Sequence, residues 1–278
     1  MGEAKRRKQA LAEGKVGAKD GTSAKPRSSQ EFLDQLPPAM RPDFLRLFDD
    51  TRAITKEELQ EIRRDADSAS RQERLGALAQ ARHADLEDAV EAAFSADPDG
   101  ERTRRTVACR KGCYFCCHVH VQATIPDAIL VAMAIRKGTV DDFSPRIRET
   151  AQRIASLDAA QRYRQAIPCP MLNDGVCGIY EVRPTACRAY LATDAKQCES
   201  SLNTASAGAA PSPVESLAYP QQISAAINGG VLEGSGAAGL QNCAVELTEA
   251  VDLILREPAV IEQWLAGESV FQPYRRGT

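Results

Sequence analysis

The chain has 278 residues, a formal net charge of −3 and 43% hydrophobic residues, which is typical of a globular protein with one large or two small domains. No apolar run is long enough to cross a bilayer, so we expect no membrane contact. The sequence has nine cysteines and no recognisable secretory signal. These features predict a cytoplasmic protein, because clustered cysteines in a reducing compartment are more often metal ligands than disulfides.

Residues 1–30 are rich in Lys, Arg, Gly and Ser and contain almost no large apolar residue. This composition predicts a disordered basic tail. A basic tail can bind nucleic acid through phosphate contacts. No aromatic residue interleaves with the charges, however, so a solvated leader is favoured over a nucleic-acid-binding arm.

Residues 31–100 form a predicted helical segment. Thr55 followed by Glu58 fits a capping box, which would open a long helix or a pair of helices running toward Phe94. Apolar residues recur there at helical spacing and should face a core. His83 lies in this stretch, where a lone histidine is expected to be a surface or packing residue rather than a metal ligand.

Eight of the nine cysteines lie in a Cys-rich segment, residues 101–200, and form two groups. The first group is Cys109, Cys113, Cys116 and Cys117, and the second is Cys169, Cys177, Cys187 and Cys198. Vicinal cysteines rarely bond to each other, so disulfides are the weaker interpretation. We interpret both groups as metal ligands.

The spacing of the first group limits its structure. One continuous helix over residues 109–117 would spread the sulfurs over about 12 Å of axis. A single zinc ion needs its sulfurs roughly 3.8 Å apart, from a Zn–S bond of about 2.3 Å. The segment is therefore not helical throughout, or it serves more than one metal atom. Gly112 favours a turn that brings Cys109 and Cys113 together.

The second group has turn signals of its own. Asn173-Asp174-Gly175 lies between two apolar runs and predicts a β-hairpin, with Cys169 and Cys177 on neighbouring arms. Pro184 predicts the start of a helix that carries Cys187.

Histidines and cations flank the thiols. The alternation of residues 118–121 predicts a short strand, from which His118 or His120 could replace a thiol or hydrogen-bond to sulfur. Basic residues surround both groups, where they would offset the net charge of about −2 at a four-thiolate zinc site. These are Arg104, Arg105, Arg110, Lys111, Arg183 and Arg188, of which Arg110 and Arg188 adjoin cysteines directly.

Together these residues resemble the bacterial cysteine-cluster family, described as a zinc- or iron-chelating domain. The resemblance rests on Cys109-x3-Cys113-x2-Cys116-Cys117, Thr124-Ile125-Pro126-Asp127, and Cys169-Pro170-x-Leu172 through Gly175-Val176-Cys177-x-Ile179-Tyr180-x2-Arg183-Pro184-x2-Cys187-Arg188. It covers roughly residues 105–200 and implies a zinc or iron site. Relatives are similar to flagellin lysine methylases, which pair an iron–sulfur cluster with S-adenosylmethionine. The resemblance thus implies, as an alternative, a methyltransferase-like enzyme with a protein substrate, although no residue outside the Cys-rich segment carries that activity over.

The remaining chain is predicted to be helical. The pattern predicts helices over 124–137, with a capping box at Asp127, and over 144–167 with breaks. A small, polar linker is expected at 201–213. Residues 214–278 then predict further helices over 214–227, 240–256 and 258–265, with a glycine-rich bend over 229–239. Cys243 falls in this tail and is interpreted as a small apolar residue.

We therefore predict a mostly α-helical protein, with a helical bundle-like arrangement around an irregular Cys-rich metal-binding core and one short β-hairpin. Eight thiols suit two four-cysteine zinc sites, or one 4Fe-4S cluster plus a further metal, and the spacing leaves open which cysteines share a metal. No phosphate-binding glycine loop or nucleophile elbow marks an enzyme. Metal binding ranks first, a methyltransferase-like enzyme second and nucleic-acid binding by the basic tail third.

Overall fold

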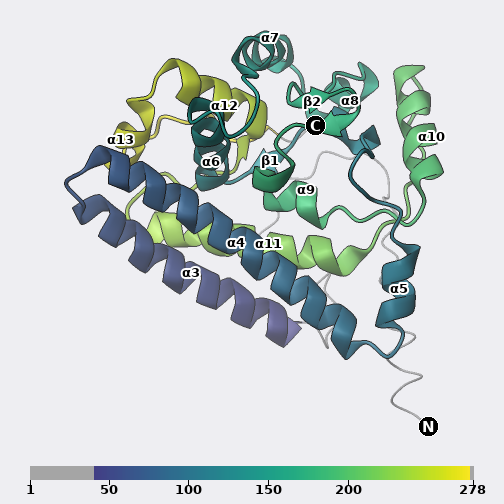
Figure 1. Cartoon of the computed structure of the whole chain (residues 1–278), viewed down its shortest axis with the longest axis horizontal. Coiled ribbons are helices and arrows are strands. Elements are labelled where there is room, and N and C mark those ends of the chain that lie inside the picture. The colour runs from purple at the N-terminus through teal and green to yellow at the C-terminus, as the bar shows by residue number, and fades with distance from the viewer. Residues whose placement is uncertain (1–40, 276–278) are drawn as a thin grey trace.

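A computed structural model of the chain describes residues 41–275, so the predicted basic tail at 1–30 lies outside the described residues. The predicted fold class is confirmed, because helices dominate and the strands are short (Figure 1). The helices are α3 (Arg41–Arg64), α4 (Ser68–Ala96), α5 (Gly100–Thr106), α6 (Ile125–Arg136), α7 (Ser144–Ile154), α8 (Ala159–Arg164), α9 (Thr185–Ala189), α10 (Ala195–Ser206), α11 (Ala218–Ala237), α12 (Leu247–Arg256) and α13 (Val260–Leu265). Two 3-10 helices, η1 (Phe115–His118) and η2 (Tyr180–Val182), lie in the Cys-rich segment.

Three long helices, α3, α4 and α11, run beside one another along one side of the molecule (Figure 1). A second group of helices, α6, α7 and α12, packs on them through α6, which contacts α4. Of the elements that carry cysteines, α9 contacts α11 and α4, while α10 contacts η1 and α8. The Cys-rich segment is thus supported by helices that come before and after it in the chain.

Two short antiparallel pairs of strands complete the fold. β2 (Leu172–Asn173) pairs with β3 (Val176–Cys177), so the predicted hairpin is confirmed. Its turn residues Asp174 and Gly175 both have positive φ, as a two-residue turn of this kind requires. β1 (Gln122–Ala123) pairs with β4 (Val245–Glu246) and joins segments more than 120 residues apart. The sequence did not predict this second pair, because two-residue strands have no readable periodicity.

The predicted capping box at Thr55 and Glu58 is wrong. Thr55 is fully buried in the middle of α3, where it faces Gly234 of α11. The chain breaks ten residues later, and Asp67 caps α4 by accepting a hydrogen bond from the backbone N–H of Ser70. Thr55 therefore serves helix packing, and a capping pattern alone did not locate the helix start.

The predicted glycine bend at 229–239 is also wrong, because α11 continues through it to Ala237. Gly230 and Gly234, one turn apart, face α3 at close range. A Cβ atom on Gly230 would lie 2.6 Å from Cβ of Thr51 and 2.7 Å from the carbonyl oxygen of Phe48. These glycines are retained inside a helix because they let two helix backbones approach each other.

Gly230→Ala should lower the free energy of unfolding by about 1–3 kcal/mol through overpacking, because a backbone oxygen blocks the added methyl. This net loss allows for the gain of about 1 kcal/mol expected when alanine replaces glycine inside a helix. Gly76→Ala in α4 is the matched control, since its Cβ would meet Met133 at 3.5 Å, an ordinary contact. Urea denaturation should show the first variant destabilised and the second stabilised. A shift of both in the same direction would contradict this account of the α3–α11 contact.

Helix α6 is the most buried element and is built as predicted. Thr124 and Asp127 form a complete capping box, and the helix stops before Gly138, whose φ is +66°. All its residues except Arg136 are buried, and the helix packs against α4, α12 and η2. Within residues 41–275, no helix combines the length and apolar character needed to cross a membrane.

Three other elements differ from their predictions. Residues 118–121 do not form a strand, because η1 ends at His118 and β1 begins only at Gln122. The predicted linker at 201–213 is helical up to Ser206, since α10 extends through its first six residues. The helix expected over 240–256 begins only at Leu247, so Cys243 lies in the loop before β4, partly buried against the core. The division of the chain into domains stays a prediction.

Candidate metal-binding site

The first cysteine group lies in a turn followed by η1. Cys109 and Cys113 occupy the turn between α5 and η1, and Cys116 and Cys117 lie within η1. The backbone N–H of Cys113 donates to the carbonyl of Arg110 at 2.9 Å, and Gly112 has a φ of +93°. Few residues other than glycine adopt this conformation, so the predicted turn at Gly112 is confirmed.

Backbone hydrogen bonds join the two cysteine groups. The N–H of Cys169, in the loop before β2, donates to the carbonyl of Cys117 at 2.6 Å. The N–H of Ala192 donates to Sγ of Cys109 at 3.1 Å, and the N–H of Ala108 donates to the carbonyl of Ala192 at 2.8 Å. Segments that are 50 to 85 residues apart in the sequence therefore meet at the thiols.

The other three cysteines of the second group lie on three different elements. Cys177 ends β3, Cys187 lies in α9, and Cys198 lies in α10, where its side chain is buried. Pro184 is the N-cap of α9, so the predicted helix start holds to within one position. The eight thiols thus come from six local structures.

The thiols interact electrostatically in two sets that share Cys116. Burial, and then the charges of Cys109, Cys113 and Cys116, raise the pKa of Cys198 to about 11. Burial, and then the charges of Cys169, Cys116 and Cys177, raise the pKa of Cys187. Cys117 belongs with the second set, since Cys169 and Cys187 both raise its pKa.

Cys116 and Cys117 differ sharply in acidity although they are adjacent. A hydrogen bond from Cys117 lowers the pKa of Cys116 to about 7, with a further contribution from Arg183. The same hydrogen bond and burial raise the pKa of Cys117. Cys116 therefore ionises more readily than Cys117, and thiolate is the form that binds metal.

Arg183 is the main cation among the thiols. Burial raises the pKa of Cys109, Cys177 and Cys187, and the charge of Arg183 offsets part of that rise. The same charge contributes to the lowered pKa of Cys116. Its guanidinium lies 3.9 Å from the ring centroid of Tyr180, and its Nε is buried without a hydrogen-bond partner. The fixed position of this charge favours thiolate formation.

The predicted ring of cations is only partly correct. The charge of Arg188 offsets part of the rise in pKa that burial causes at Cys177. Arg110, which also adjoins a cysteine, makes no such contribution at Cys109 or Cys116. Arg104 and Arg105 pair with Glu91 and Glu101 instead. Sequence neighbours of a cysteine often point elsewhere, whereas Arg183, at the junction of η2 and α9, lies among the thiols.

Tyr190 is a neighbour of the thiols that the sequence did not predict. Burial raises the pKa of its phenol, and the charges of Cys198, Cys116 and Cys109 raise it further. It therefore lies at the first set of thiols as a neutral phenol. Its position three residues after Cys187 was the only available signal, and that spacing alone is uninformative.

The histidines occupy three different environments. Nδ1 of His118 lies 3.3 Å from the carbonyl oxygen of Phe115, and burial lowers its pKa. His120 is buried with neither ring nitrogen hydrogen-bonded, close to Glu246 and Arg162. His83 is a packing residue as predicted, since it is buried and bonded to Asp127.

Within residues 41–275, no three cysteine, histidine or carboxylate side chains converge in a geometry that would hold a metal ion. The donor set nevertheless fits zinc or iron by its chemistry, because eight thiols share one neighbourhood and repel one another when ionised. Thiols from both cysteine groups therefore lie near one another, although within residues 41–275 no three of them face a common centre.

Residues 108–206 match the CxxCxxCC family model, described as "Putative zinc- or iron-chelating domain". The match spans a little over a third of the chain and includes all eight clustered cysteines. Three residues separate Cys109 from Cys113, where the family pattern has two, and the turn at Gly112 accommodates the longer spacer. Comparisons with curated proteins and with solved structures found no match.

Proposed function

We propose that the chain binds zinc or iron through the eight thiols between Cys109 and Cys198. The observation that carries this proposal is that thiols from six local structures interact with one another inside the segment that matches a chelating family. A hydrophobic core does not require cysteines at these positions. A bound cation would give them a shared role.

The energetics of the thiols support this proposal. Burial and mutual repulsion raise the pKa values of Cys109, Cys169, Cys177, Cys187 and Cys198. The hydrogen bond with Cys116, and then burial, raise the pKa of Cys117. Ionising them without a nearby cation is therefore unfavourable. A divalent metal supplies the positive charge, and because thiolate is its ligand, binding releases protons and stabilises the folded segment.

The two interacting sets support two centres of four cysteines each. We assign Cys109, Cys113, Cys116 and Cys198 to one centre, and Cys117, Cys169, Cys177 and Cys187 to the other. The charge of Cys116 raises pKa values in both sets, those of Cys109 and Cys198 in the first and that of Cys187 in the second. We place Cys116 in the first set, which otherwise has only three members. Arg183 lies near both and offsets part of their negative charge.

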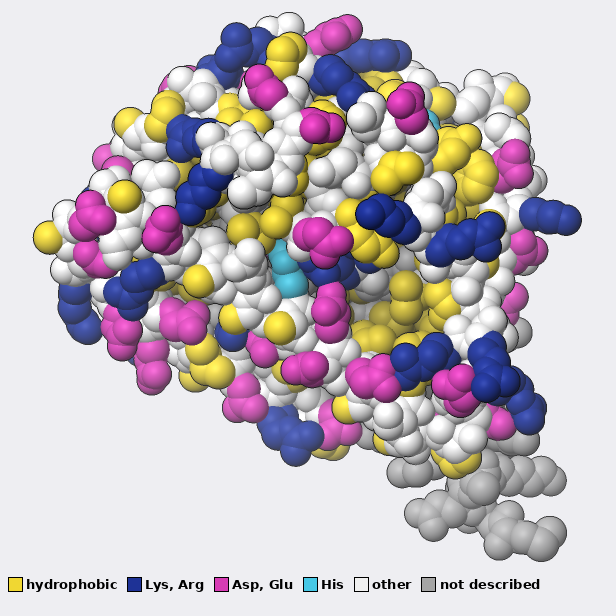
Figure 2. All heavy atoms as spheres, viewed as in Figure 1, with side chains coloured by type: hydrophobic (Ala, Val, Ile, Leu, Met, Phe, Trp, Pro, Cys, Tyr) yellow, Lys and Arg dark blue, Asp and Glu magenta, His cyan; other side chains and the backbone are white. Residues whose placement is uncertain are grey.

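A 4Fe-4S cluster in one centre is the finer alternative, because four thiolates also hold such a cluster. With S-adenosylmethionine it would serve the methyltransferase-like activity that the family resemblance implies. Nucleic-acid binding would depend on residues 1–30, outside the described residues. On the face seen in Figure 2, acidic and basic side chains are interspersed rather than gathered into a basic patch.

Elemental analysis and an absorption spectrum of anaerobically purified protein test the proposal together. Two zinc ions per chain with no visible absorption would support two zinc centres. Four iron atoms with a brown colour, plus one further metal, would support the cluster. Protein with less than one metal ion per chain after reconstitution with either metal would contradict the proposal.

Cys198→Ser tests the assignment of the two centres. It should reduce the metal content from two zinc ions to one per chain, because the first centre loses a thiolate while the second keeps all four. Cys243→Ser is the matched control and should keep both zinc ions. Burial raises the pKa of Cys243, and no other thiol contributes to that shift. Loss of both metals in Cys198→Ser at unchanged thermal stability would contradict two separate centres.

A further inference from the structure

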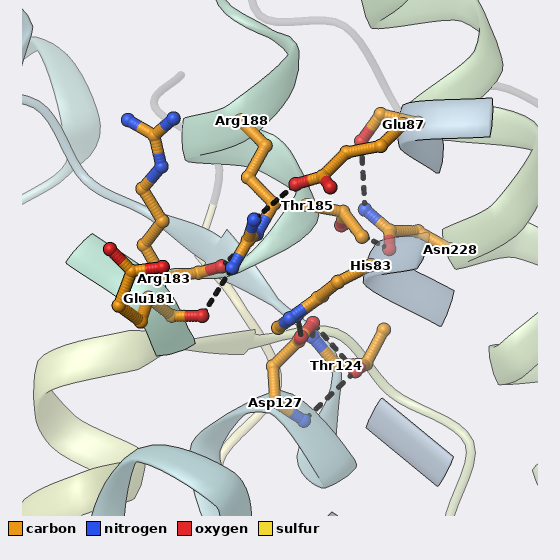
Figure 3. A network of polar contacts seen from close by, with 10 residues as sticks. His83, Glu87, Thr124, Asp127, Glu181, Arg183, Thr185, Arg188 and Asn228 are labelled. Atoms are coloured by element: carbon orange, nitrogen blue, oxygen red, sulfur yellow. Dashed lines mark hydrogen bonds and ion pairs between the residues drawn. The ribbon is translucent and has the colours of Figure 1, made fainter. Parts of the chain in front are cut away.

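Helix α4 carries two polar side chains that both reach the Cys-rich segment. His83 and Glu87 are four residues apart, so they lie on one face of the helix, one turn from each other. Figure 3 shows them pointing into the same polar network. Neither residue is among the eight cysteines assigned to the two proposed centres. Helix packing alone does not require the hydrogen bonds that their side chains make.

His83 holds the element that follows the first cysteine group. Its Nε2 lies 2.8 Å from Oδ1 of Asp127, and both side chains are buried. The other oxygen of Asp127 accepts hydrogen bonds from Oγ1 of Thr124 at 2.8 Å and from the N–H of Thr124 at 3.2 Å. One carboxylate therefore closes the start of α6 and ties it to α4, seven residues after Cys117.

Glu87 holds the second cysteine group through Arg188. The carboxylate of Glu87 accepts a hydrogen bond from Nη1 of Arg188. Nε of Arg188 donates to the carbonyl of Arg183 at 2.8 Å, and its Nη2 donates to the carbonyl of Glu181 (Figure 3). Arg188 thus braces the turn between Cys177 and Cys187, and Glu87 fixes this braced turn to α4.

Helix α11 supports the same turn from another side. Oγ1 of Thr185, the first residue of α9, donates to Oδ1 of Asn228 at 2.7 Å. Thr185 is buried, so this contact is shielded from water. The segment that carries Cys187 is therefore bonded to two long helices, although it contains only five helical residues.

We infer that His83 and Glu87 are positioning residues, which hold the two cysteine groups in register so that less ordering is needed when metal binds. This inference rests on the proposed metal-binding function. The cysteine segments contain little regular structure, and ordering them at the moment of binding would weaken the affinity. Fixing both groups to one rigid helix face removes part of that cost beforehand.

Glu87→Gln is the primary test, measured as zinc affinity by competition with a chelator of known affinity. A partly exposed ion pair of this kind predicts affinity weakened by about two- to fivefold. Glu91→Gln is the matched control, one turn further along α4. Glu91 is about as exposed as Glu87, and its ion pair with Arg104 ties α4 to α5 rather than to the segment that carries Cys187. The control should bind zinc with unchanged affinity.

Cobalt substitution separates positioning from ligation. Glu87→Gln and His83→Gln should both retain the cobalt–thiolate absorption bands of the unmodified protein, because no ligand is removed, while their affinities fall. A changed band pattern would make the residue a ligand and overturn the inference. Equal weakening by Glu91→Gln would also overturn it, because the effect would then reflect general stability of α4.

Hydrogen exchange of the metal-free protein tests the positioning without relying on metal. Amides of residues 181–189 should exchange faster in Glu87→Gln than in the unmodified chain, and those of residues 124–128 faster in His83→Gln. Glu91→Gln should change neither segment. If the unmodified chain bound no metal, the proposed function would fail, whereas unchanged exchange in both test variants would overturn the inference alone.

Discussion

Under the proposed metal binding, removal of metal with a chelator is expected to unfold the cysteine-bearing segments outside the turn 181–189, which stays tied to α4 and α11. Helices α3, α4 and α11 should remain folded. Structural zinc contributes about 10–16 kcal/mol in small metal sites, as much as the whole stability of an ordinary domain, about 5–15 kcal/mol. The segments 107–121 and 165–180 contain only short elements and depend on that contribution. The long helices have their own apolar contacts, including Leu59, Leu75 and Ile227.

Hydrogen exchange resolved by segment is the suitable measurement, with the thermal midpoint as a second readout. Exchange should rise in the two cysteine-bearing segments after chelation. Helix α6 is the internal control, because its buried residues pack on α4 and α12 and should stay protected. Adding zinc back should restore protection. An unchanged thermal midpoint and unchanged circular dichroism after complete metal removal would contradict this expectation.

Arg162→Met should have the largest effect of any single substitution considered, a loss of about 3–5 kcal/mol in the free energy of unfolding. Nη1 of Arg162 lies 2.7 Å from Oε1 of Glu246, and both side chains are almost fully buried. Without the guanidinium, the carboxylate of Glu246 would be buried without its counter-charge. Oε2 of Glu246 also accepts the N–H of Glu249 at the start of α12, so this helix should fray as well.

The matched control is Arg256→Met, which removes the pair with Asp252 at the other end of α12. Arg256 is 39% exposed, so its loss should cost less than about 1 kcal/mol. Urea denaturation of both variants in the same metal state gives the comparison. The double variant Arg162→Met with Glu246→Met should recover much of the lost stability, because no buried charge remains unpaired. Equal losses in the two single variants would refute the importance of burial here.

Local patterns predicted the parts of the fold whose determinants lie within a few residues. The turn at Asn173–Gly175, the capping box at Thr124 and the glycine turn at Gly112 all follow from backbone preferences of adjacent residues. Cysteine spacing also identified the segment that later matched a chelating family. None of these inferences required knowledge of distant contacts.

Distant contacts decided the rest of the site. Arg183 was one of several nearby cations in the sequence, and only the folded arrangement of η2 and α9 placed it among the thiols. The pair of Arg162 with Glu246 spans 84 residues and had no sequence signal. The ties from α4 to both cysteine groups arise in the same way, because residues 83 and 87 gain their partners only when α6 and α9 dock.

The sequence by itself identified the candidate metal ligands and determined where the tight turns fall, because thiol chemistry and backbone preference belong to individual residues and their neighbours. Only the tertiary structure decided that the glycines of α11 continue a helix. It also decided which thiols interact with one another. The helix at the glycines and the sets of thiols both depend on which distant segment each residue contacts. The local sequence around Gly230 predicts a helix break. In the structure Gly230 lies inside α11, where its lack of a side chain allows α3 to approach closely.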